Sequence, residues 1–451
     1  MAQRFLCPLG LTYTTTDPEA VACLHDAFVA MLTYNVSPTP HLQKALELDP
    51  HFVMANVFKA FLLLTVGGIG ADENVQESAK AINSQDRNDL TWRERRHVEA
   101  MERKLVNDEK AAVDIWEDIL LKFPRDIYAI RGVNQAYIFL GDSVNIRDCI
   151  ARILPAWDES MTCYPHLLSM YSFGLEESGL MSKAIEVAER SLSLNPALPW
   201  AFHTLSHVYG ATESPERGID LLIKSRKHWV EGGLSVHMTW HLCLCYLDAG
   251  DLDAALKEYD TVLKMKVNDV AGFVDAVSLL WRIECTGIDI GEERWAGLIE
   301  KVNEYSNRHS MAWYDAHIMM ALACRSAKDH AARLLLGRNL LQSLKDYGGS
   351  VKSHNAWVTN EVGIPLCEAL LAFGNEEYEK TVSLILPIRY KCCALGWSSG
   401  QRHTFAITLI RAAMQAKNFS LARALLSEVK ELWPKHKSTA KLYLQVMNSF
   451  V

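Results

Sequence analysis

The chain has 451 residues, of which 49% are apolar and 22% are charged, a composition that excludes intrinsic disorder over most of its length. With 24 glycines and 14 prolines it has fewer backbone breakers than average, which favours long helices over a turn-rich sandwich or barrel. The formal net charge of −8 disfavours a nucleic-acid or anionic-membrane partner, because both require a basic surface.

The cysteines and the apolar segments indicate a cytoplasmic protein. The 11 cysteines are scattered and include no Cys-x-x-Cys pair, which is typical of reduced thiols. The first twenty residues lack the apolar core of a signal peptide. The most apolar stretch, residues 52–71, contains Asn56 and Lys59 and is too interrupted to span a bilayer. We therefore expect a cytoplasmic protein with no membrane segment.

Several segments along the chain share one pattern: an apolar helix, a turn, and a second helix that carries a small residue twelve positions before a proline. The pairs are Ala112 and Pro124, Ala184 and Pro196, and Ala422 and Pro434. This pattern resembles the tetratricopeptide repeat, a helix-turn-helix unit of about 34 residues.

The repeats predict the domain organisation. A single helix pair is too small to bury its own apolar face, so stacked pairs are needed to form a continuous core. We expect one all-α, tetratricopeptide-repeat-like α-solenoid over residues 1–451, built of degenerate units and either open or curled into a closed superhelix. The clearest repeats are expected at residues 93–126, 127–164, 165–198, 199–235, 236–270 and 403–436.

Longer segments carry a closer resemblance that extends over nearly the whole chain. They are LTWRERRHVEAM (90–101), AFHTLSHVY (201–209), HMTWHLCLCYLDAGDLDAALKEYD (237–260), YDAHIMMAL (314–322), VGIPLCEAL (362–370) and ILPIRYKCCALGWSSGQRHTF (385–405). In these segments the chain resembles the tetratricopeptide repeat protein 38 family. The resemblance implies an all-helical solenoid and implies no particular activity.

Histidines are concentrated in one part of the chain, with five of the 16 between positions 203 and 241. Four of them form two His-x₃-His pairs, His203 with His207 and His237 with His241. Residues four apart lie on one face of a helix, and this is the spacing by which a helix offers two imidazoles to one metal ion. Because the pairs are one repeat apart, the four histidines form a candidate divalent-metal site or the lining of a small pocket.

The first helix of each repeat is expected to line a concave groove. The candidate groove or pocket residues are mostly aromatic or imidazole-bearing, with few carboxylates, a lining that suits a peptide or a small molecule. They are Arg131, His166, Trp200, His203, His207, His237, Trp240, His241, Asp315, His317, Gln401 and Arg402. Arg402 is expected to clamp a carboxylate or phosphate.

Two functions follow from this pattern. The first is a binding protein without established catalysis that holds a peptide, a protein segment or a small ligand in its groove. The alternative is a metal-dependent or histidine acid–base enzyme, for example a hydrolase, built on the four clustered histidines. In HTLSH, Thr204 stands where HExxH has its glutamate, so no general base and no catalytic residue is assigned. A purely structural role for the histidines, as hydrogen-bonded core residues, is the third interpretation.

Overall fold

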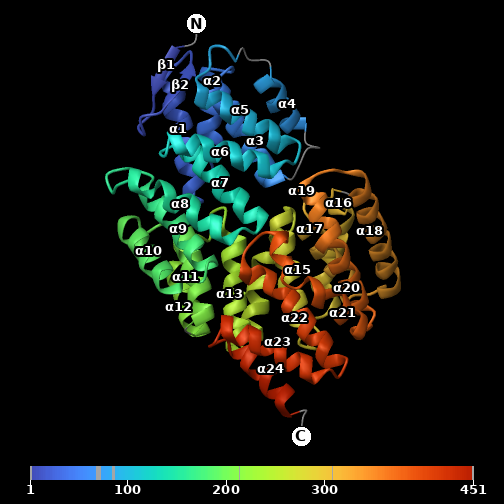
Figure 1. Ribbon diagram of the computed structural model, residues 1–451. Helices are drawn as coiled ribbons and strands as arrows, with labels where there is room; N and C mark the ends of the chain where they lie inside the picture. The colour runs from blue at the N-terminus through green and yellow to red at the C-terminus, as the bar shows by residue number, and fades with distance from the viewer. Residues whose placement is uncertain (1–2, 68–72, 84–86, 213, 307, 449–451) are drawn as a thin grey trace. The chain divides into compact units, whose positions relative to one another are not determined.

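The computed structural model describes residues 3–67, 73–83, 87–212, 214–306 and 308–448. The chain divides into two compact units (Figure 1): unit 1 comprises Met1–Thr204 and Lys227–Leu234, and unit 2 comprises Leu205–Arg226 and Ser235–Val451. Both are built of paired helices, which confirms the all-α, tetratricopeptide-repeat-like fold class. None of the described helices is long and apolar enough to cross a bilayer. The cysteines are free thiols, and all except Cys393 are buried.

Unit 1 opens with a short β-hairpin and continues as helices that pack in pairs (Figure 1). Its elements are β1 (Gln3–Leu6), β2 (Thr12–Thr15), α1 (Pro18–Thr33), α2 (Thr39–Leu48), α3 (Val53–Gly67), α4 (Glu73–Asn83), α5 (Trp92–Leu105), α6 (Glu109–Lys122), α7 (Ile127–Leu140), α8 (Ser143–Ile153), α9 (Tyr164–Glu177) and α10 (Met181–Leu194). The helix α11 (Pro199–Thr212) begins in unit 1 and continues into unit 2.

The hairpin is an element that the repeat pattern does not predict. Its strands are antiparallel, with Gln3 opposite Thr15 and Leu6 opposite Thr12. Tyr13 points inward and is buried, and its ring packs edge-on against Phe52 at 6.0 Å. One inward-facing aromatic side chain therefore attaches the hairpin to the helical core.

Helix α7 shows why the paired helices begin and end where they do. The Asp126 side chain caps its start by accepting a hydrogen bond from the backbone N–H of Ala129 at 3.1 Å. Gly141 ends the helix in the left-handed region, with φ of 67°. On the neighbouring α6, Trp116 is fully buried against Gly132 of α7, where a side chain would leave no room for the indole. Local capping and a small residue at the contact thus set this helix pair.

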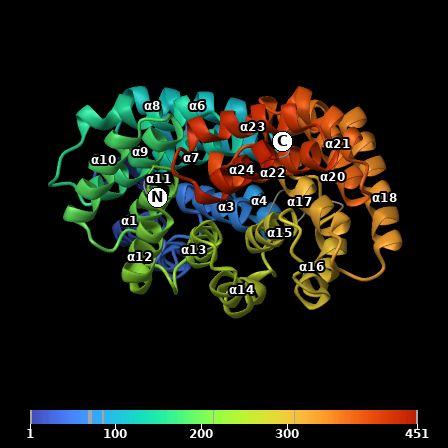
Figure 2. The same cartoon turned by 90° about the horizontal axis from the view of Figure 1, so that it is seen from below.

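Unit 2 contains the remaining helices, several of which Figure 2 shows side by side, α17, α18 and α20 among them. They are α12 (Pro215–Ser225), α13 (Ser235–Ala249), α14 (Leu252–Thr261), α15 (Val270–Glu284), α16 (Glu292–Tyr305), α17 (Ala312–Ala323), α18 (His330–Ser350), α19 (His354–Val358), α20 (Ile364–Gly374), α21 (Tyr378–Ile385), α22 (Ser399–Gln415), α23 (Phe419–Leu432) and α24 (Lys437–Asn448).

The C-terminal helices of unit 2 return to its first helices. Helix α22 packs against α15, and the Trp281 indole N–H donates to the Thr408 hydroxyl at 2.9 Å. Helix α24 packs against α13, and Asp248 accepts hydrogen bonds from the backbone N–H groups of Lys437 and Ser438 at 3.1 and 2.8 Å. The faces of α13 and α15 that meet these helices are therefore buried by the chain itself.

A pair of glycine substitutions tests the packing of unit 2. A Cβ at Gly374, the last residue of α20, would lie 2.4 Å from the Ala323 carbonyl oxygen, whereas a Cβ at Gly297 on α16 would meet no atom within 4 Å. We expect Gly374→Ala to lower the free energy of unfolding by about 1–3 kcal/mol. Gly297→Ala is expected to raise it by about 0.5–1 kcal/mol. Urea unfolding measures both, and effects of the same sign would contradict this packing.

Candidate functional site

A small pocket in unit 1 collects residues from the end of α1 and from α7, α9 and α11. About 240 Å³ of space lies among these residues when the solvent in front of the opening is included, and the enclosed part has room for about one water molecule. Of the candidate residues, Arg131, His166 and Trp200 lie together here. We call this the unit 1 pocket, and its lining consists of Leu32, Tyr34, Arg131, Asn134, His166, Ser169, Met170 and Trp200.

Arg131 brings a positive charge into the unit 1 pocket. The residue is 8% exposed, and its Nη2 donates to the Tyr34 hydroxyl at 2.9 Å. Its buried Nε has no hydrogen-bond partner among the described residues. A buried guanidinium normally pairs with a carboxylate, so a neutral phenol leaves most of its charge uncompensated.

His166 lines the same pocket, and both of its ring nitrogens are buried. The residue is 4% exposed, and neither nitrogen has a well-aligned hydrogen-bond partner among the described residues. Burial lowers the pKa of His166 to about 4, against a smaller opposing effect of the Thr162 backbone, so the ring is neutral at pH 7. The Trp200 indole N–H is likewise buried without a partner in the described structure. The pocket thus offers polar atoms that its own walls do not satisfy.

Aromatic rings form the wall beside these polar atoms. Tyr34 and Trp200 are stacked, with centroids 5.5 Å apart and planes 10° apart. His203 stacks on the Trp200 ring at 4.8 Å, and Phe173 lies 5.2 Å from the same ring in an edge-on arrangement. Within unit 1, His203 therefore packs against the Trp200 ring.

In unit 2, three of the predicted histidines lie together with an aspartate. The Nε2 atoms of His207 on α11 and His241 on α13 are 3.2 Å apart, and those of His241 and His237 are 3.1 Å apart. His237 Nδ1 lies 2.9 Å from a carboxylate oxygen of Asp275 on α15. We call His207, His237, His241 and Asp275 the unit 2 histidine cluster.

Trp240 and Arg282 pack beside this cluster. Trp240 is fully buried and stacks on the His237 ring at 5.4 Å, while the Arg282 guanidinium lies 5.5 Å from the Trp240 ring. Arg282 Nη2 donates to the backbone oxygens of Gly400 and Gln401 at 2.8 and 3.1 Å. Burial lowers the pKa of Arg282 to about 9. The Gln401 side chain caps α22 together with Ser398, so its amide is used at the helix terminus.

The other candidate residues have packing partners of their own. Asp315 Oδ1 forms a hydrogen bond with His309 Nδ1 at 3.1 Å, and burial raises the pKa of Asp315. His317 Nδ1 lies 2.8 Å from the Trp313 carbonyl oxygen, and burial lowers the His317 pKa to about 4. Arg402 donates to the backbone oxygens of Gly396 and Trp397. The remaining polar atoms Asp315 Oδ2 and His317 Nε2 are buried without a hydrogen-bond partner among the described residues.

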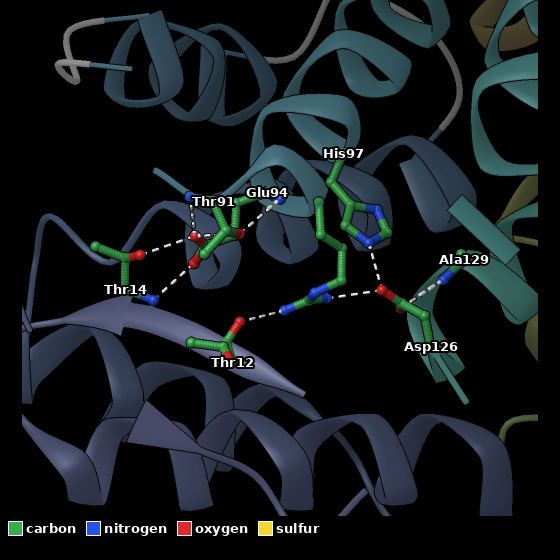
Figure 3. Close-up of polar contacts among 8 residues, drawn as sticks. Thr12, Thr14, Thr91, Glu94, His97, Asp126 and Ala129 are labelled. Carbon is green, nitrogen blue, oxygen red and sulfur yellow. Dashed lines mark hydrogen bonds and ion pairs between the residues drawn. The ribbon is translucent and has the colours of Figure 1, made fainter. Parts of the chain in front are cut away.

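A further polar cluster, missed by the sequence analysis, lies at the start of unit 1 (Figure 3). Arg93 and His97 of α5 both contact Asp126, at 2.7 and 2.8 Å, and Arg93 also donates to the Thr12 backbone oxygen at 2.8 Å. The next residue, Glu94, accepts from Thr14 of the hairpin at 2.7 and 2.8 Å.

Most polar atoms of this cluster have internal partners, since Glu94 also forms a capping box with Thr91, while His97 Nδ1 is buried without a hydrogen-bond partner among the described residues. Burial raises the pKa of Asp126, but His97 and Arg93 outweigh it through charge and hydrogen bonds and hold that pKa well below its usual range. The four-residue spacing of Arg93 and His97 was the available signal, since it places both on one helix face. We assign the cluster to stability.

No family model matches this chain. Among solved structures, it is similar to a chain of the APC/C hetero-tetramer Cut9–Hcn1, with 10% identity over 95% of this chain and 76% of that one and a TM-score of 0.44. It is also similar to yeast Tom70, with 12% identity, 96% of each chain covered and a TM-score of 0.35. The third similarity is to the structure of Naa15/Naa10 bound to HypK-THB, with 14% identity over 96% and 68% of the chains and a TM-score of 0.25. Identities this low carry no information about a shared ligand.

Proposed function

We propose that this chain is a helical-repeat binding protein whose unit 1 pocket receives an anionic group of a peptide, a protein segment or a small ligand. One observation carries the proposal: the buried Arg131 guanidinium has a neutral hydroxyl as its hydrogen-bond partner. Charge in a low-dielectric site is stabilised by an opposite charge, and a carboxylate or phosphate fits the guanidinium fork.

The rest of the pocket supports a polar group attached to an apolar or aromatic body. His166 and the Trp200 N–H supply further hydrogen-bonding atoms, since both lack well-aligned partners in the described structure. The stacked Tyr34 and Trp200 rings provide a flat apolar surface next to them. We place binding in unit 1 because the C-terminal helices of unit 2 cover faces of α13 and α15.

The test compares Arg131→Gln with Arg190→Gln, a matched change at an exposed arginine of unit 1 that pairs with Glu159. The probes are peptides with a free C-terminal carboxylate, the same peptides amidated, and inorganic phosphate, titrated by calorimetry. We expect the natural chain to bind an anionic probe and Arg131→Gln to bind it roughly 10- to 100-fold more weakly, because a charged hydrogen bond is lost. Arg190→Gln should bind unchanged. Equal affinity of Arg131→Gln and the natural chain would refute the proposal.

We also propose that the chain belongs to the tetratricopeptide repeat protein 38 family and acts in the cytoplasm. The family proposal rests on segments such as residues 237–260 and 385–405. The free, mostly buried thiols support a reducing compartment.

The unit 2 histidine cluster favours a second candidate function, a metal-dependent or histidine acid–base enzyme. The supporting observation is the 2.9 Å contact between His237 and Asp275, a pairing that fixes the tautomer of a catalytic or metal-binding imidazole. A panel of ester and phosphoester substrates, assayed with the natural chain and His241→Asn, tests it. Hydrolysis that is equal in both proteins would contradict it.

A further inference from the structure

In the unit 2 histidine cluster, the Nε2 atom of His241 lies within 3.2 Å of the Nε2 atoms of two other histidines, which come from two helices. His237 and His241 are four residues apart on α13, and their Nε2 atoms are 3.1 Å apart. His207 on α11 places its own Nε2 3.2 Å from that of His241. From this geometry we propose that His207, His237 and His241 bind one first-row transition-metal ion, with Zn²⁺ as the reference ion, and that Asp275 orients His237.

The tautomer of His237 can be assigned from its surroundings. An ionised carboxylate only accepts hydrogen bonds, so Nδ1 of His237 donates its proton to Asp275 at 2.9 Å. In the neutral ring this leaves a lone pair on Nε2, which is directed at His241. A histidine that donates one ring N–H to a carboxylate and presents the other nitrogen is the usual arrangement of a metal ligand.

The Nε2 atom of His241 contacts the Nε2 atoms of both His207 and His237, but it has only one bonding position in its ring plane. In a neutral ring that position holds either a proton or a lone pair. A single metal ion accepts a lone pair from each of the three nitrogens at once. Ligand nitrogens at about 2.0–2.1 Å from a tetrahedral Zn²⁺ are about 3.3 Å apart, close to the two distances that join His241 to His237 and to His207, 3.1 and 3.2 Å.

The donor set selects the class of ion. Neutral imidazoles suit zinc, copper, nickel and iron, whereas magnesium and calcium require oxygen ligands. Three protein ligands leave a fourth position for water or an exogenous ligand. Trp240 stacks on His237, so the ring is held by packing as well as by Asp275. The proposal concerns metal binding and holds whether or not the site is catalytic.

The experiment uses the full-length, untagged protein after chelator treatment and dialysis. Zn²⁺ is titrated in competition with a chromophoric chelator, and Co²⁺ is added separately to record the visible absorption of a tetrahedral nitrogen-ligated ion. We expect one equivalent of Zn²⁺ and a cobalt spectrum. His241→Asn, which removes the central ligand, should lose both signals while keeping the helical circular dichroism of the natural chain.

Asp275→Asn separates ligand orientation from simple loss of the fold. It keeps all three imidazoles and is expected to weaken Zn²⁺ binding roughly 10- to 100-fold, because the hydrogen bond that orients His237 is weakened. His354→Asn, on α19 of the same unit, is the control and should bind Zn²⁺ as the natural chain does. If His241→Asn fails to fold, His207→Asn takes its place. The absence of saturable Zn²⁺ binding, or unchanged binding in folded His241→Asn and Asp275→Asn, would overturn the proposal.

Discussion

Replacing Asp126 with asparagine is expected to lower the free energy of unfolding by about 3–5 kcal/mol, the usual cost of breaking a buried ion pair on one side. Asp126 is fully buried and accepts bonds from Arg93 and His97 through one carboxylate oxygen. Asparagine keeps an oxygen to cap α7 but removes the charge. The Arg93 guanidinium, itself 2% exposed, would then lie in the core without its counterion.

A matched substitution separates this effect from helix capping. Asp142 caps α8 through a bond from the Asn145 backbone N–H at 3.0 Å, as Asp126 caps α7, but it is only partly buried. Asp142→Asn should cost less than about 1 kcal/mol, because asparagine is also a good N-cap residue. Urea unfolding followed by circular dichroism measures both variants. Similar losses in the two would mean that the ion pair around Arg93 adds nothing beyond capping.

As the pH falls, the protein is expected to lose stability from about pH 6.5 downward, before most carboxylates begin to take up protons. Burial lowers the pKa of His166 and of His317 from 6.5 to about 4, and it lowers the pKa of His97 as well. Below about pH 6.5 the unfolded chain takes up protons at these histidines while the folded chain does not. Since stability falls with decreasing pH wherever the unfolded state binds more protons, the free energy of unfolding decreases from about pH 6.5 to pH 4.

The size of this effect is set by the number of such histidines. Each contributes up to about 1.4 kcal/mol per pH unit in that window. For His166 the total is on the order of 3 kcal/mol, and it applies without discount because the side chain is buried.

Replacing His166 with phenylalanine tests the assignment. The slope of the unfolding free energy against pH is measured by urea titrations between pH 7 and pH 4. In this variant it should be smaller by up to about 1.4 kcal/mol per pH unit, which corresponds to one proton fewer taken up on unfolding. An unchanged slope would show that His166 takes up its proton in the folded state.

The fold class followed from local sequence signals, and the reason is visible in the core. Ala112, Ala184 and Ala422, the small residues of the repeat pattern, are all completely buried. Each helix pair needs a small side chain where its two helices approach most closely. The small residue therefore recurs once per repeat, and this recurrence can be recognised in the sequence. The β-hairpin has no such repeat, and its single inward aromatic side chain, Tyr13, gives too little periodicity to predict it.

The candidate sites were predictable where the contacts are local or where the residues are one repeat apart, as His207 and His241 are. The four-residue spacing of His237 and His241 is enough to place both imidazoles on one face of α13, because the helical period fixes that relation. Asp275 lies 38 positions after His237 and contacts it through the packing of α13 against α15. In the unit 1 pocket, Tyr34 bonds Arg131 across 97 positions. No spacing rule relates such residues.

The sequence by itself therefore determined the helical period, the small residues of the repeats, and the chemical types available for a site. Each of these depends on neighbours within one or two helical turns, or within one repeat, so the linear order records it. Only the tertiary structure decided that Arg131 meets Tyr34, that Asp126 meets Arg93 and His97, and that α22 and α24 return to α15 and α13. These contacts join residues far apart in the chain, and their partners are selected by the packing of whole helices.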